Sequence, residues 1–320
     1  MHIIDDAHKL MTGSITKVQW YRTPTNLRRE NNEVYNDKTV YANLRSQLAE
    51  ILEFWGPNVQ DADVNEFFHG YLNPVLDEEK PFKLYRYMPP RYFNIRNIET
   101  QMIHLSTNGS MNDTFEGIPE FRGKLSCQDA KELEDLAYMA CFTEENDNTL
   151  MWSHYAKDHT GVCVEYDLKK LDNDTNGVLS HLFPIVYSEQ RPALRDIGSM
   201  IDSQKQLNEA INKGNVYDGK EPFNDILPLF LTKGKVWEYE KEWRILYTKK
   251  QMYDIDDEEL YTGNLSFKCI SSIYLGYRIQ PAIKQHLLEI SKRLSSLGSF
   301  VPVYQAQLSP GGYNIVFERC

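Results

Sequence analysis

The stretch WEYEKEWRILY, residues 237–247, alternates aromatic or aliphatic side chains with charged ones. If these residues form a strand, the apolar side chains lie on one face and Glu238, Glu240, Glu242 and Arg244 on the other. A carboxylate row in a cleft can hydrogen-bond a sugar hydroxyl or stabilise developing positive charge, and a neighbouring arginine keeps a carboxylate ionised. The competing interpretation is a solvent-exposed face with a surface ion pair, which contributes little to stability.

The stretch LMWSHYAKDHTG, residues 150–161, places Trp152, His154 and Tyr155 close together. Such a cluster is suited to stacking on a purine or nicotinamide ring, and a histidine satisfied within a core is the competing interpretation. Ser153 beside His154 is not a catalytic dyad, because adjacent side chains point apart on a helix or a strand. His154 and His159 lack the spacing of a helical zinc pair and no HExxH occurs, so we expect no metal.

Two further segments carry candidate binding residues. LYRYM, residues 84–88, predicts an early strand with Tyr85 and Arg86, where an arginine between rings either pairs internally or binds a phosphate or carboxylate. STNGSMNDTFEG predicts a polar loop that begins at Ser106 and turns at Asn112 and Asp113, for which turn capping is the competing role. The P-loop, GxSxG and GxGxxG motifs are absent.

Composition bounds the class of protein. The 320 residues are 41% hydrophobic, which suffices for an ordinary core, and a net charge of −11 argues against a broad nucleic-acid-binding surface. Five cysteines without a CxxC pair are typical of reduced thiols in a cytoplasm. The acidic start MHIIDDAHKL predicts no signal peptide, and no run approaches the roughly 18 apolar residues of a membrane span. We therefore expect a cytoplasmic protein with no membrane partner.

The elements that must position these residues follow from periodicity. Helical spacing over 40–55 ends at Gly56-Pro57, a shorter helix is expected over 62–72, and a soft boundary near residue 80 separates an N-terminal helical extension (1–80) from an α+β core domain (81–320). Within the core domain, strands are expected at 83–88, 101–107, 161–168, 237–247, 270–279 and 313–318, and helices at 129–139 and 281–297. Residues 188–225 are polar and predict helix or loop.

The order of the elements favours an α+β fold with mixed, mainly antiparallel sheets, because no regular βαβ repeat occurs. The blocks LYRY, LSTNGSMNDTFEG, MWSHYA, GVCVEYD and YEKEWR together resemble a bacterial and phage family of unknown function, number twenty-nine seventy-one in the domain-of-unknown-function series. This resemblance covers roughly residues 82–277 and implies no activity by itself.

A second resemblance concerns mechanism. An early strand with arginine beside an aromatic residue, an aromatic cluster and a late strand with glutamate are similar to the layout of ADP-ribosyltransferases, although no Ser-Thr-Ser strand stands between them. This resemblance implies an ADP-ribosyltransferase-like cleft with flanking helices, NAD as the substrate and Glu242 as the catalytic residue. It implies that the residues binding NAD are Tyr85, Arg86, Ser106, Asn112, Asp113, Trp152, His154, Tyr155 and Arg244.

Three functions remain open from the sequence. The first is an NAD-consuming ADP-ribosyltransferase or NAD glycohydrolase that acts as a toxin, a defence effector or a phage-borne modifier on an unknown macromolecular acceptor. The second is a non-enzymatic sensor or interaction module with a nucleotide or peptide in an aromatic pocket. The third is a metal-dependent nuclease or hydrolase, which the acidic chain and the carboxylate spacing disfavour.

Overall fold

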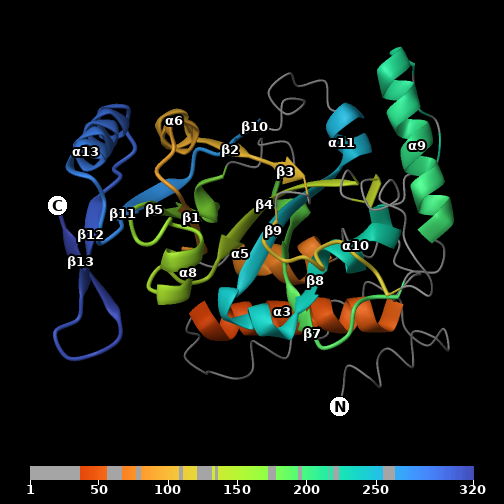
Figure 1. Ribbon diagram of the computed structural model, residues 1–320, viewed down its shortest axis with the longest axis horizontal. Helices are drawn as coiled ribbons and strands as arrows, with labels where there is room; N and C mark the ends of the chain where they lie inside the picture. The colour runs from red at the N-terminus through yellow and green to blue at the C-terminus, as the bar shows by residue number, and fades with distance from the viewer. Residues whose placement is uncertain are drawn as a thin grey trace.

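The computed structural model describes residues 37–55, 67–76, 81–107, 111–120, 132–133, 136–171, 178–193, 197–215, 217, 219, 223–254 and 264–320. Its architecture is α+β, with a mainly antiparallel sheet and flanking helices, as the order of the elements predicts. Figure 1 shows the sheet running across the molecule, with α13 near one end and α9 near the other. The first 36 residues, and the start of the helix expected over 62–72, lie outside the described residues.

The main sheet contains nine of the described strands, in the order β13-β12-β11-β5-β1-β4-β9-β6, with β3 also paired to β4. Their bounds are β1 (Lys83–Met88), β3 (Ser106–Thr107), β4 (Ala137–Thr143), β5 (Val162–Asp167), β6 (Leu182–Pro184), β9 (Glu242–Thr248), β11 (Ile270–Leu275), β12 (Val303–Leu308) and β13 (Ile315–Arg319). All neighbours in this sheet are antiparallel except β11 and β12. Two small sheets pair β2 (Met102–His104) with β10 (Asn264–Ser266), and β7 (Val186–Ser188) with β8 (Thr232–Gly234).

The parallel pair needs a crossover, and α13 (Pro281–Ser296) supplies it between β11 and β12. This helix follows its predicted pattern, with Pro281 at its start, Leu287, Ile290 and Leu294 buried, and Gly298 just beyond its end at φ 95°. The expected strand at 161–168 is also present as β5. Its residues from Val162 to Tyr166 are buried on both faces, because Val162, Val164 and Tyr166 pack in the main core and Cys163 packs in a second cluster with Trp152 of α8 (Thr149–His154).

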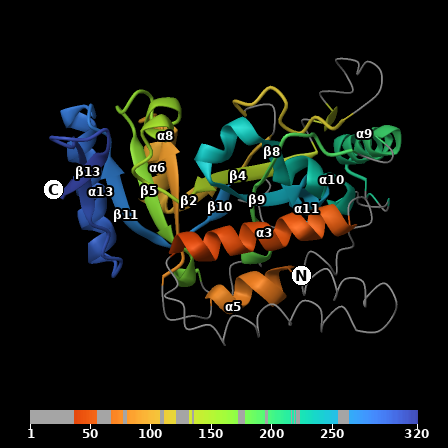
Figure 2. The same cartoon turned by 90° about the horizontal axis from the view of Figure 1, so that it is seen from below.

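Further helices flank the sheet. They are α3 (Asp37–Trp55), the π-helical turn η2 (Phe68–Leu72), α5 (Asn73–Leu76), α6 (Tyr92–Thr100), α8 (Thr149–His154), α9 (Ile197–Lys213), α10 (Phe223–Leu231) and α11 (Lys249–Asp254). Short 3-10 turns are η4 (Leu168–Lys170), η5 (Val178–His181) and η6 (Lys235–Glu240). Figure 2 shows α3 along one side of the sheet with α5 beyond it, and α8 on the opposite side.

Helix α3 packs directly on the sheet. The Tyr41 ring lies edge-on to Trp243 of β9 and to Phe82, with ring centroids 5.9 Å and 5.1 Å apart, and Leu44 is fully buried. The buried side chains of α3 and α5 belong to the same hydrophobic core as those of β1, β4 and β9. The described helices before residue 80 therefore hold one face of the sheet that carries Glu242 on its other face.

Two sequence-based expectations about the elements are wrong. The expected helix over 129–139 is helical at residues 132–133 but gives way to β4 from Ala137 onward, because these residues pair with β9; residues 129–131 and 134–135 lie outside the described residues. The strand expected over 237–247 begins only at Glu242, since residues 235–240 form η6 and Lys241 adopts a left-handed conformation with φ 44°. Because the chain turns at Lys241, Trp237 and Tyr239 do not lie on the strand face that carries Trp243.

Candidate functional site

Pairing of three strands brings the candidate residues together. Thr143 of β4 is the register partner of both Tyr85 in β1 and Glu242 in β9. Residues opposite each other on neighbouring strands point to the same face of a sheet. Tyr85, Thr143 and Glu242, which are more than 150 residues apart at the extremes, therefore form one row across the sheet.

A pocket of about 540 Å³ lies over this row. The expected site residues that line it are Tyr85, Arg86, Ser106, Asn112, His154, Tyr155 and Glu242. The other lining residues are Tyr87, Pro89, Arg91, Met111, Met139, Cys141, Phe142, Thr143, Met151, Lys157, Lys233 and Glu240. Ligand pockets commonly span about 300–1,000 Å³, so a nucleotide-sized molecule matches this space.

A buried ion network forms the floor of the pocket. Arg244 is fully buried and donates to both oxygens of Glu242, from Nε to Oε1 at 2.6 Å and from a terminal nitrogen to Oε2 at 3.1 Å. Lys233 Nζ donates to Glu242 Oε2 at 2.9 Å and to Glu240 Oε2 at 2.5 Å. Glu116 accepts from Arg244 at 2.6 Å, and the Phe230 carbonyl accepts from it at 2.7 Å. The expected alternative of a surface ion pair at Glu242 and Arg244 is therefore wrong.

The network separates the pKa values of its two pocket carboxylates. Burial alone would raise the pKa of Glu242, but Arg244 and Lys233 outweigh it and hold that pKa far below its ordinary value. Burial and the charge of Glu242 together raise the pKa of Glu240, opposed by Lys233 and by the hydroxyl of Tyr155, which donates to Glu240 Oε1. Two carboxylates with pKa values pushed in opposite directions can divide acid–base and electrostatic roles.

Helix α8 and the residue that caps its end place two ring-bearing side chains, His154 and Tyr155, at the wall of the 540 Å³ pocket. The side chain of Asn148 caps the helix by accepting from the Leu150 and Met151 amides at 3.0 Å and 3.3 Å, and its Nδ2 donates to Tyr239 O at 2.9 Å. This bond ties α8 to η6. His154 Nδ1 lies 3.1 Å from the Tyr239 hydroxyl, so the contact between these two elements orients the side chains that face the pocket.

Three of the expected binding residues do not line this pocket. Trp152 is fully buried beneath it, with its Nε1 donating to Asn146 O at 2.7 Å and its ring edge-on to Tyr87. Arg244 is fully buried behind Glu242, where it can hold that carboxylate but not contact a ligand. Asp113 lines a separate cavity of about 260 Å³.

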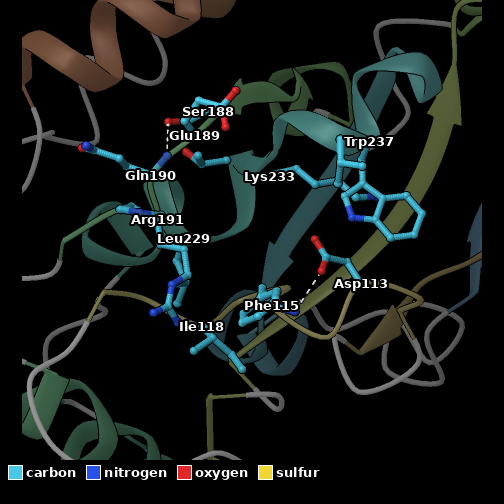
Figure 3. A pocket seen from close by; sticks show the side chains of 14 residues that line it. Asp113, Phe115, Ile118, Ser188, Glu189, Gln190, Arg191, Leu229, Lys233 and Trp237 are labelled. Carbon is cyan, nitrogen blue, oxygen red and sulfur yellow. Dashed lines mark hydrogen bonds between the residues drawn. The ribbon is translucent and has the colours of Figure 1, made fainter.

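Figure 3 shows that second cavity, with Asp113 and Trp237 on one side and Arg191 on the other. Asp113 Oδ1 accepts from the Phe115 amide at 2.9 Å, which is the turn-capping role expected of such residues. Lys233 lines both cavities, and its Nζ lies 5.1 Å from the centre of the Trp237 ring. The two spaces are therefore neighbours on either side of one lysine.

The serine next to His154 pairs with a different histidine. Ser153 Oγ lies 3.2 Å from His159 Nε2 and donates to Thr149 O at 3.0 Å. Because the single hydroxyl proton is used on the carbonyl, the serine accepts from the imidazole, and the pair is not a nucleophile activated by a base. Burial, followed by the charge of Arg278, lowers the pKa of His159.

Sequence reasoning did not assign Lys233, Glu240 or Glu116 to the site. Lys233 carried one signal, a lysine two positions after the buried segment that ends at Leu231, because a charge that follows buried residues needs partners. Glu116 had no local signal, since only the fold brings it to Arg244 across 128 positions. Within the described residues, no group of three or more His, Cys, Asp or Glu side chains is placed to hold a metal ion.

The fold and the pocket define an α+β protein with a ligand-sized cavity above a buried network of three carboxylates and two cations. Residues 151–245 match a family described as Protein of unknown function (DUF2971). The family resemblance expected from the sequence is confirmed over these residues, which contain Tyr155, Lys233, Glu240 and Glu242. No curated protein and no solved structure matches the chain. Among the described residues, no helix is long and apolar enough to cross a membrane.

Proposed function

We propose that the 540 Å³ pocket binds NAD and that the protein cleaves the nicotinamide–ribose bond, as an ADP-ribosyltransferase or an NAD glycohydrolase. One observation carries this proposal. Arg86, Tyr155 and Glu242 come from distant segments, and all three line a single pocket. An ADP-ribosyltransferase-like relationship of the fold is part of the same proposal.

The charge of Glu242 supports chemistry at a sugar carbon. Breaking the bond between ribose C1′ and the nicotinamide nitrogen leaves its electron pair on nicotinamide and builds positive charge on the ribose. A preorganised carboxylate in a buried site stabilises that charge better than water does. Glu242 is ionised at neutral pH because its pKa is lowered, and its oxygens accept three hydrogen bonds from Lys233 and Arg244. A ribose hydroxyl would bind this carboxylate beside the Cys141 thiol, which also lines the pocket and hydrogen-bonds Glu242.

Glu240 suits the complementary role. Its raised pKa makes its carboxylate the stronger base of the two, and Tyr155 links it to the pocket wall. In the proposed reaction, an attacking hydroxyl or water forms the new bond to ribose C1′ and loses its proton to Glu240. The aromatic side chains of Tyr85, Tyr87 and Tyr155 provide apolar area against which the leaving nicotinamide ring can stack.

The test is nicotinamide release from NAD by the full chain, followed by liquid chromatography, with and without cell extract as the source of an acceptor. We expect release by the wild-type protein, and a loss of at least about 100-fold in Glu242→Gln, the scale seen when one electrostatic group is removed from an active site. Glu238→Gln is the matched control, because Glu238 is exposed and lies in the same segment. A wild-type protein that neither binds NAD in calorimetry nor releases nicotinamide would end the proposal.

A second function is favoured by one specific observation. Lys233 and Arg244 together donate three hydrogen bonds to Glu242, and Lys233 and Tyr155 donate one each to Glu240, as expected of a structural network. In that case the protein is a non-enzymatic sensor that holds a nucleotide in the pocket. This alternative predicts that Glu242→Gln reduces ligand binding only to the extent that it lowers the melting temperature. A Glu242→Gln protein with unchanged melting temperature and unchanged NAD binding, but no cleavage, contradicts the alternative.

A further inference from the structure

Four cations line the 540 Å³ pocket, Arg86, Arg91, Lys157 and Lys233, and they differ in exposure and in their partners. Lys233 lies at the floor and is neutralised by Glu240 and Glu242. Arg91 and Lys157 also line the pocket, are solvent-exposed, and make no ion pair within the described residues. An exposed, uncompensated cation at a pocket wall is available to an anionic group of a ligand.

The two exposed cations lie at one end of the pocket and the carboxylates at the other. The row that contains Glu242 crosses β1 at Tyr85, and Arg91 follows Met88, where β1 ends. Three residues of strand between Tyr85 and Met88 span about 10 Å. Along β1, the row that contains Glu242 and the end of the strand, beyond which Arg91 follows, are thus separated by about the length of a nucleoside fragment.

Lys157 belongs to the same end as Arg91. The loop that carries it passes against the end of β1, because a Cβ on Gly161 would stand only 2.2 Å from Met88 O. Lys157, Asp158 and His159 are three successive left-handed residues, with φ between 48° and 65°. Such a conformation costs about 1–2 kcal/mol per residue, so close packing must hold it in place.

That packing comes from a second glycine. A Cβ on Gly276 would stand 2.2 Å from His159 O, and the amide of Arg278 donates to the same oxygen at 2.9 Å. The loop is therefore held between the ends of β1 and β11, and Lys157 is presented to the pocket from a fixed backbone. Asp158 is the only carboxylate next to it in the loop, and it does not line the pocket.

Arg91 is presented by the start of a helix. It is the N-terminal cap of α6, and its side chain makes no capping hydrogen bond. Helix N-termini carry partial positive charge and unpaired amides, so α6 adds to the field of Arg91 at this end of the pocket. Arg86, which donates to His104 O at 3.3 Å, lines the wall between the two ends.

From this separation of charge we infer that Arg91 and Lys157 bind the phosphate groups of a nucleoside diphosphate moiety whose sugar end faces Glu240 and Glu242. The inference rests on the proposed function for the direction in which the nucleotide lies, and it identifies two binding residues that the sequence patterns did not single out. It specifies the ligand class as a molecule with an anionic end and a neutral or cationic sugar end. Phosphate recognition by exposed cations is weakened by salt.

Calorimetry with ADP and adenosine tests this inference on the full chain. We expect the wild-type protein to bind ADP at least 10-fold more tightly than adenosine, and the Arg91→Ala/Lys157→Ala double variant to lose that preference while its adenosine affinity stays unchanged. Raising the salt concentration should weaken ADP binding by the wild-type protein more than by the double variant. Lys292→Ala is the matched control, because Lys292 is exposed on α13 and does not line this pocket.

Both substituted side chains are exposed, so the double variant should melt at the wild-type temperature. Equal wild-type affinity for ADP and adenosine, or unchanged ADP affinity in the double variant, overturns the inference. NAD cleavage that depends on Glu242 but has an unaltered KM in the double variant also overturns it and leaves the proposed function intact. Loss of ADP binding in the double variant, with no nicotinamide release by the wild-type protein, supports the inference and refutes the proposed function.

Discussion

Replacement of Arg244 by methionine tests whether the ion network is a buried one that holds Glu242. The substitution keeps an unbranched apolar side chain in the core but removes four hydrogen bonds, which go to two oxygens of Glu242, one of Glu116 and the Phe230 carbonyl. Removal of one partner from a buried ion pair costs about 3–5 kcal/mol, because the other charge stays buried without compensation. At about 2 °C per kcal/mol for a large chain, the melting temperature should fall by about 6–10 °C at pH 7.

The loss of melting temperature in Arg244→Met should become smaller at lower pH. In the wild-type protein the pKa of Glu242 is lowered from 4.5, so its ionised form stabilises the fold above about pH 4.5, and this contribution is lost as the pH falls below that value. Without Arg244, only Lys233 opposes the effect of burial, so the pKa of Glu242 rises relative to the wild-type protein. Protonation then removes a buried charge that is only partly compensated, and the difference in melting temperature between the two proteins should narrow as the pH falls from 7 towards 4.5.

The assay is thermal unfolding followed by circular dichroism at several pH values. Arg293→Met is the matched control, because Arg293 pairs with Glu99 at 2.5 Å but its side chain is 49% exposed. Exposed pairs contribute about 0–1 kcal/mol, so this control should shift the melting temperature by about 2 °C or less. A loss of less than 2 °C in Arg244→Met, or a loss that grows on acidification towards pH 4.5, would refute the description of the network as a buried, charge-compensated one.

Three other outcomes follow from the same geometry. Tyr155→Phe should move the acid limb of the kcat/KM profile to higher pH, because the hydrogen bond from the tyrosine hydroxyl lowers the pKa of Glu240 and the variant lacks it. An acid limb at the wild-type pH contradicts a role for Glu240 as the base. Leu44→Ala should lower the free energy of unfolding by about 2–5 kcal/mol in denaturant titrations, because Leu44 is fully buried. In the control Leu297→Ala, where Leu297 is 75% exposed, the free energy of unfolding should change by less than about 0.5 kcal/mol. Equal losses in the two variants would show that α3 is not packed on the sheet. Gly161→Ala should cost about 1–3 kcal/mol and weaken ADP binding, because its Cβ would meet the last backbone carbonyl of β1; unchanged stability and binding would contradict that close approach.

Local patterns predicted several elements correctly. The apolar stripe of α13, with Pro281 before it and Gly298 after it, contains its own start and stop signals, and β1 and β5 keep the bounds that their aromatic and β-branched residues indicate within one or two positions. These signals are local because helix periodicity and capping depend only on residues a few positions apart. They did not depend on knowing which strand lies next to which.

The predictions failed where distant partners compete with local propensity. Residues Ala137–Met139 have helical periodicity with the segment before them, but they become part of β4 because β9 and β3 pair with that edge. The alternation of residues 237–247 is continuous in the sequence, yet the chain turns at Lys241 before the strand starts. A sequence pattern has no information about the sheet edge at which a strand must begin.

The candidate site shows the same division. Residue types alone indicated that Arg86, Tyr155 and Glu242 are chemically useful, and the structure brings all three to one pocket. The same reasoning also selected Trp152, whose ring is fully buried, and Asp113, which faces a second cavity. An aromatic residue next to a histidine looks the same in sequence whether it lines a pocket or supports it from below.

By itself, the sequence determined the α+β class, the strongest helices and strands, and the presence of charged residues within apolar segments, because each depends on composition or on spacing over one or two turns. Only the tertiary structure decided that Lys233 and Arg244 pair with Glu116, Glu240 and Glu242 in the core, and that Arg91 and Lys157 remain exposed and without an ion pair among the described residues at the opposite end of the pocket. Whether a charge is paired or available depends on atoms within a few ångströms, and folding brings those atoms together from positions as far as 128 residues apart.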